Sequence, residues 1–74
     1  MMTESRYQEI ALSIAWWNEL PAESRTTILR SLTDRGLEAT VEEAWNQFGK
    51  GIRRNGWRPQ RESLTKAIEI VSTG

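Results

Sequence analysis

The chain has 74 residues, with ten basic and ten acidic side chains and a formal net charge of zero. It contains no cysteine and no histidine, which excludes disulfide bonds, thiolate metal sites and imidazole chemistry. A single core in a domain of this size supplies only about 3–5 kcal/mol of stability. We therefore expect a second copy of the chain or a partner protein to add to it.

Four segments repeat apolar residues at three-and-four spacing, and no segment alternates apolar and polar residues. This pattern predicts one all-α domain over residues 1–74, a small compact bundle of about four short helices at residues 3–19, 21–35, 40–55 and 59–72. The N-terminal residues lack the apolar core of a signal peptide, and no apolar run reaches the roughly 18 residues of a membrane span. We expect a soluble, cytoplasmic protein that does not contact a membrane.

The first predicted helix, residues 3–19, is apolar on two sides. One side carries Tyr7, Ile10, Ala11, Ile14 and Trp17, and the other carries Leu12, Trp16 and Leu20. Such a helix is either the central helix of its domain or is covered by a second molecule. We expect Trp17 in the core and interpret Trp16, with Leu12 and Leu20, as an apolar anchor for a partner. The alternative places Trp16 beneath the final helix.

The second predicted helix follows the Leu20-Pro21 break, because proline is tolerated in the first turn of a helix. Its inward residues are Ala22, Ile28, Leu29 and Leu32. Gly36 lies just beyond the last periodic residue. We expect it to close this helix in the left-handed conformation.

The third predicted helix opens at Thr40-Val-Glu-Glu43, which matches a capping box. Its apolar stripe is Val41, Ala44, Trp45, Phe48 and Ile52, which places Trp45 in the core. Two interior glycines each cost about 1 kcal/mol relative to alanine, so we expect the last turns to fray before Asn55-Gly56. The last predicted helix starts at Pro59, with Leu64, Ala67, Ile68 and Val71 inward.

No group in the sequence is prepared for catalysis. Ser63 and Lys66 have the spacing of an S-x-x-K motif, but the two further motifs of that enzyme class are absent, and we interpret the pair as a solvated helix face. Glu38, Glu42 and Glu43 could gather one hard cation, yet negative charge at a helix N-terminus is the simpler explanation. We expect no enzymatic activity, no cofactor and no metal.

The segment of residues 50–61 holds half of all the basic side chains, a tryptophan and no acid. Residues 1–48 carry four arginines and eight acids, a net charge of −4, whereas residues 49–74 carry six basic and two acidic side chains, a net charge of +4. This asymmetry indicates a surface for an anionic partner. The candidate contact residues are Lys50, Arg53, Arg54, Trp57, Arg58 and Arg61.

Three interpretations of this segment remain open. Arginine and tryptophan are enriched at protein interfaces, so the first is a small adaptor, regulator or inhibitor that docks on an acidic protein or on the acidic half of a second copy. The second is an accessory nucleic-acid-binding protein, which the acidic first half and the isoelectric point of 6.2 oppose. The third interpretation assigns the segment no partner. In it, Arg53 and Arg54 complement the helix dipole, and Trp57 closes the end of the bundle as a hydrophobic lid.

Overall fold

Every regular element of the computed structural model is a helix within residues 2–73, the residues that the structure describes, with side chains described from Arg6 onward. The elements are α1 (Met2–Glu19), α2 (Ala22–Asp34), α3 (Val41–Ala44), the π-helical turn η1 (Trp45–Gly49), α4 (Lys50–Arg54) and α5 (Arg61–Thr73). Because α3, η1 and α4 follow one another without a break, they form one helical segment. The four predicted helices and the all-α class are confirmed.

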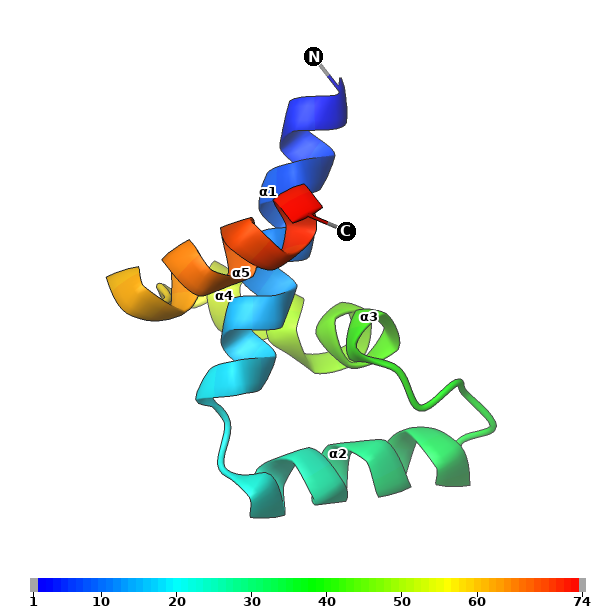
Figure 1. Cartoon of the computed structure of the whole chain (residues 1–74). Coiled ribbons are helices and arrows are strands. Elements are labelled where there is room, and N and C mark those ends of the chain that lie inside the picture. Colours follow the sequence, from blue (N-terminus) through cyan, green and yellow to red (C-terminus); the bar gives the residue numbers. More distant parts are fainter. Residues whose placement is uncertain (1, 74) are drawn as a thin grey trace.

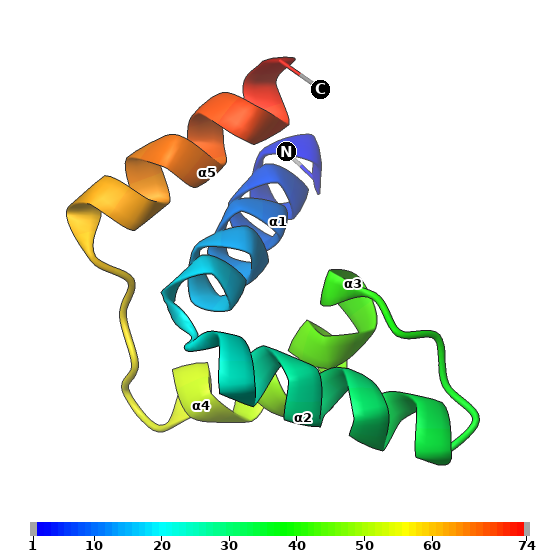
Figure 2. The same cartoon turned by 60° about the horizontal axis from the view of Figure 1, so that its bottom comes forward.

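Helix α1 is the central helix. Helix α5 packs against one side of it and the segment of residues 41–54 packs against the other (Figure 2). Helix α2 crosses beyond the C-terminal end of α1 and runs alongside the segment of residues 41–54 (Figure 1). Neighbours in its own chain therefore cover most of the apolar residues of α1, although Tyr7 and Ile10 stay 48% and 42% exposed. No helix among residues 2–73 has both the length and the apolar character that a bilayer span requires.

The larger core cluster lies where α1, α2 and the segment of residues 41–54 meet. It consists of Trp16, Leu32, Ala44 and Trp45, all buried. The indole rings of Trp16 and Trp45 pack edge to face with 5.7 Å between their centroids, a favoured geometry for aromatic pairs. Trp45 is core as predicted, and Trp17 is half-buried against the same cluster.

The smaller core cluster lies between α1 and α5. Its buried members are three alanines, Ala11, Ala15 and Ala67. Small side chains allow two helix backbones to approach closely, so α5 lies directly on α1. This close contact leaves larger residues beside it only partly covered, and Ile68, which we expected to face inward, is 49% exposed.

Local signals set most of the helix ends. Gly36 has a φ of +75°, and the Leu37 N–H donates to the Leu32 carbonyl at 2.9 Å, which is the Schellman closure expected for α2. Thr40 Oγ1 accepts a hydrogen bond from the Glu43 N–H at 3.1 Å. This is one half of the predicted capping box.

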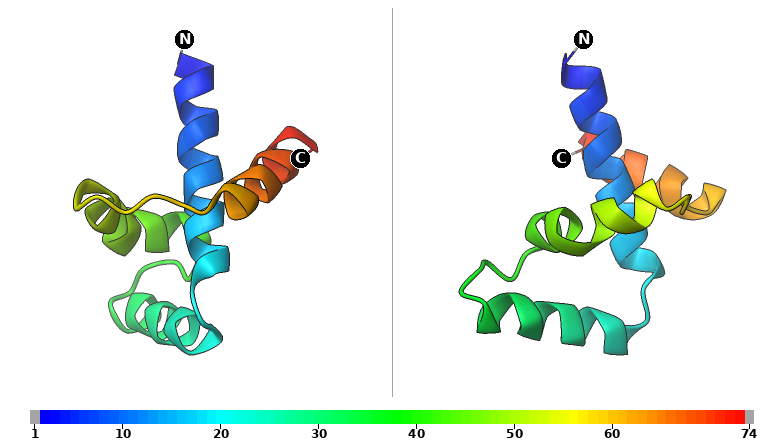
Figure 3. Two further views of the ribbon diagram at one scale, coloured as in Figure 1. Left: turned by 90° about the vertical axis from the view of Figure 1, so that its left-hand side faces the viewer. Right: turned by 180° about the vertical axis from the view of Figure 1, so that it is seen from behind.

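Both prolines lie just outside the helices that we expected them to begin. Pro21 is the extended N-cap residue of α2, with a ψ of 152°. The last helix begins at Arg61, two residues after Pro59. The Gln60 carbonyl accepts the first helical hydrogen bond, from the Leu64 N–H. The Gln60 N–H bonds outside the helix and donates to Glu19 Oε2 at 2.8 Å. The bond to Glu19 ties the loop of residues 55–60 to α1, where the loop crosses from α4 to α5 (Figure 3).

Candidate partner-binding site

The predicted apolar anchor on α1 is wrong in its central residue. Trp16 is 2% exposed, because α2 and the segment of residues 41–54 cover it, and it does not lie under α5 as the alternative proposed. Leu12 and Leu20 are half-buried and belong to different surfaces. Leu12 borders a groove between α1 and α5, whereas Leu20 borders a hollow between α1, α2 and α4. These three residues do not form one patch.

The predicted basic residues do converge. Lys50, Arg53, Arg54 and Arg58 line one cavity of about 470 Å³, and all four are exposed. We call this cavity and its four cationic residues the basic hollow. Arg61 does not line it, since that residue already belongs to the first turn of α5.

The turn after α4 brings the two ends of the basic segment together. Gly56 has a φ of +108°, and its N–H donates to the Arg53 carbonyl at 3.0 Å while the Trp57 N–H donates to the Ile52 carbonyl at 3.2 Å. This Schellman closure folds the chain back over the end of the helix. Arg58, in the following loop, therefore lies beside the arginines of the last helical turn.

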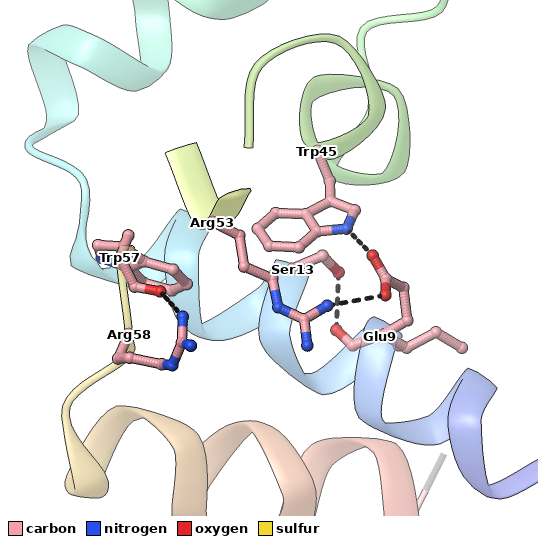
Figure 4. A network of polar contacts seen from close by, with 7 residues as sticks. Glu9, Ser13, Trp45, Arg53, Trp57 and Arg58 are labelled. Atoms are coloured by element: carbon pink, nitrogen blue, oxygen red, sulfur yellow. Dashed lines mark hydrogen bonds and ion pairs between the residues drawn. The ribbon is translucent and has the colours of Figure 1, made fainter. Parts of the chain in front are cut away.

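Trp57 is a lid on the core rather than a free contact residue. It is half-buried and packs against the larger core cluster, with 6.3 Å between its ring centroid and that of Trp45. Its backbone carbonyl accepts a hydrogen bond from Arg58 Nη1 at 2.9 Å (Figure 4). The ring thus holds the loop in place, and the loop in turn presents Arg58.

Glu9 is the site residue that we did not predict. One of its carboxylate oxygens accepts a hydrogen bond from Trp45 Nε1, and the other forms an ion pair with Arg53 Nη1 at 3.3 Å (Figure 4). Glu9 is an acid in register with the apolar side of α1, three and seven residues before Leu12 and Trp16. This position could have identified Glu9 as a site residue from the sequence, because an acid in line with a buried helix face needs polar partners.

The electrostatics of the basic hollow are unbalanced. Among the described side chains that line it, four are cationic and only Glu9 is anionic. Both members of the Glu9–Arg53 pair are more than one third exposed, so solvent screens that attraction. The hollow therefore remains a site of net positive charge, suited to carboxylates or phosphates.

The acidic residues lie at the other end of the same helical segment. Glu38 and Glu42 are exposed and Glu43 is half-buried, and Glu42 and Glu43 are in the first turn of α3. Glu43 Oε2 accepts a hydrogen bond from Gln47 Nε2 at 2.9 Å. Acids at the N-terminus and Arg53 and Arg54 at the C-terminus both complement the helix dipole.

No protein family, no curated protein and no solved structure matches this chain.

Proposed function

We propose that this protein is a small, non-enzymatic interaction module, an adaptor, regulator or inhibitor, that binds the acidic surface of another protein through its basic hollow. The observation that carries the proposal is the convergence of Lys50, Arg53, Arg54 and Arg58 on one cavity, with one carboxylate among the described residues that line it. Residues from α4 and from the following loop are brought together there, and their mutual repulsion is relieved when an anionic partner binds.

Residue chemistry supports a protein as the partner. Arginine side chains form paired hydrogen bonds to carboxylates and are enriched in interfaces. The exposed positions of all four cations leave them accessible to a partner. Complementary charge of this kind sets orientation and association rate more than affinity, which suits a regulator that must find one surface.

A second copy of the chain is one protein that offers such an acidic surface. Its Glu38, Glu42 and Glu43 would face the basic hollow of the first copy. Light scattering after size-exclusion chromatography, at low and at high ionic strength, tests this form of the proposal. A dimer that dissociates as salt is added supports it, and a monomer at every concentration assigns the hollow to a different protein.

Nucleic acid is the second candidate partner, because the same cations suit phosphates. Two features of the molecule weigh against it. Trp57 packs on Trp45, so its ring is less available to stack on a base. The first 48 residues carry a net charge of −4, which would repel a phosphate backbone that extended beyond the hollow.

The test compares two ligands and two charge-matched variants. Fluorescence anisotropy measures binding of a labelled glutamate-rich peptide and of a labelled DNA duplex. The Lys50→Glu/Arg54→Glu double variant alters the hollow, and the Arg30→Glu/Lys66→Glu double variant makes the same change in net charge on exposed positions of α2 and α5. We expect the first variant to weaken peptide binding by at least about tenfold, from two lost ion contacts, and the second to leave it within about twofold.

Two results would contradict the proposal. One is equal weakening by both double variants, which would mean that only the overall charge matters. The other is binding of DNA, with a steep loss of affinity as salt rises, while the acidic peptide does not bind at any ionic strength.

A further inference from the structure

A groove between α1 and α5 is lined almost entirely by apolar side chains. It has a volume of about 380 Å³. Its walls include Tyr7, Gln8 and Leu12 from α1 and Leu64, Ile68 and Val71 from α5. Tyr7 and Ile68 are 48% and 49% exposed, although side chains of this kind are usually covered when they cluster.

The alanine contact between α1 and α5 explains why this groove exists. The two helices touch through Ala11, Ala15 and Ala67, which are too small to fill the space beside the contact. The larger side chains of Leu12 and Ile68 lie beside this contact and form part of the groove walls. The groove is a consequence of how α5 is seated.

The groove and the basic hollow lie next to each other on one face of the molecule. Glu9 borders the hollow and Leu12 borders the groove, and residues three apart are neighbours on a helix surface. In Figure 4 the Arg53 side chain lies over α1 and points toward Glu9, and Arg58 lies on the loop that leads into α5. In Figure 3 the loop of residues 55–60 crosses α1 on its way from α4 to α5.

We propose that the segment recognised here is an acidic amphipathic helix, whose apolar side lies in the α1–α5 groove and whose carboxylates reach the basic hollow. This inference rests on the proposed function and names the partner's chemistry. An apolar stripe seated in a groove supplies the anchoring contacts. Glutamates on the adjoining flank of the same helix meet Lys50, Arg54 and Arg58.

Other occupants fit this face less well. The apolar groove offers nothing to the phosphates of a nucleic acid. A bilayer surface is flat on this scale and does not enter a concave site. A second copy offers no free acidic amphipathic helix among its described residues. Its α2 and α5 each carry two basic and two acidic side chains, and its α1 and the segment of residues 41–54, which carries Glu42 and Glu43, bury apolar residues in its own core.

The test uses a labelled synthetic peptide of about 18 residues, roughly 27 Å as a helix, with leucines at helical spacing and glutamates along one flank. The control peptide has the same composition in an order that destroys the apolar stripe. Anisotropy titrations measure both with the full-length protein. We expect the amphipathic peptide to bind at least about tenfold more tightly than the control.

Two variants of α5 form a matched pair for the same titration. Ile68→Asp places a charge in the groove, and Ile70→Asp places the same charge on an equally exposed residue that does not line it. We expect Ile68→Asp to weaken binding of the amphipathic peptide by about tenfold and Ile70→Asp to change it by less than about twofold. If Ile68→Asp loses helical circular dichroism, Tyr7→Ser on the opposite wall replaces it with the same expectation.

The outcomes separate this inference from the proposed function. Equal binding of the two peptides, with no effect of Ile68→Asp, would show that the groove takes no part in binding and would leave the basic hollow as the whole site. If no acidic peptide binds, both the role of the groove and the proposed function are contradicted. If the protein binds vesicles that contain anionic lipid and does not bind the amphipathic peptide, the partner is a membrane surface and the proposed helical partner is contradicted.

Discussion

Gly49 shows how one residue determines the packing of the core. It is buried, and a Cβ built at this position would overlap the six-membered ring of Trp45. Gly51, two residues later, has nothing within 4 Å of such a Cβ. The two glycines that we expected only to weaken the helix therefore have different consequences. The missing side chain at Gly49 allows the Trp45 ring to lie against the backbone. At Gly51 the missing side chain only adds conformational freedom to the chain.

We predict opposite effects for alanine at these two glycines. Gly49→Ala should destabilise the fold by about 1–3 kcal/mol, because the ring of Trp45 must shift. Gly51→Ala should stabilise it by about 0.5–1 kcal/mol, because alanine is the better helix former. Urea denaturation followed by circular dichroism measures both. Equal effects of the same sign would show that the Trp45 ring is not seated over Gly49.

Glu9 joins the core to the site, since its carboxylate bonds both Trp45 Nε1 and Arg53 Nη1. Glu9→Gln keeps an oxygen acceptor for the indole and removes the only negative charge among the described residues that line the basic hollow. We predict that it changes the free energy of unfolding by less than about 1 kcal/mol and strengthens binding of an acidic peptide about two- to fivefold.

Glu9→Ala is the matching control for that prediction. It removes the acceptor as well, which leaves the indole N–H without its partner, and should destabilise the protein by about 1–3 kcal/mol. Thermal unfolding monitored by circular dichroism distinguishes the two variants. If Glu9→Gln destabilises the protein as much as Glu9→Ala, the charge and not the hydrogen bond holds Trp45.

At the scale of an element, the closure of α4 decides whether the basic residues form a site. Gly56 adopts a φ of +108°, a conformation that side chains disfavour. We predict that Gly56→Ala destabilises the fold by about 1–2 kcal/mol and weakens acidic-peptide binding, because Arg58 leaves the basic hollow. Anisotropy and urea denaturation measure the two effects. Gly51→Ala, which lies within α4 itself, is the control for the binding measurement.

For the molecule as a whole, the alanine contact determines how α5 is seated. Ala67 is fully buried against α1, whereas Lys66 beside it is exposed. We predict that Ala67→Leu costs about 1–3 kcal/mol by overpacking, and that Lys66→Leu changes stability by less than about 0.5 kcal/mol. Urea denaturation tests the pair. Similar stability of both variants would mean that α5 is not held by close approach to α1.

The sequence by itself determined the four helices, the closure at Gly36, the cap at Thr40 and the burial of Trp45. Each depends on residues within a few positions of one another, through hydrogen bonds and helical periodicity. Clustering of the basic residues was also predictable, because they are close in sequence and the Asn55-Gly56 turn folds the loop back toward the helix.

Only the tertiary structure decided which surfaces are covered. Periodicity placed Trp16 on a second apolar side of α1, but it did not reveal that α2 and the segment of residues 41–54 cover that side. Glu9 and Arg53 are 44 positions apart, and the α1–α5 groove joins side chains from opposite ends of the chain. Such contacts depend on how helices cross, and the crossing is set by the sizes of the side chains between them, Ala11, Ala15 and Ala67 among them.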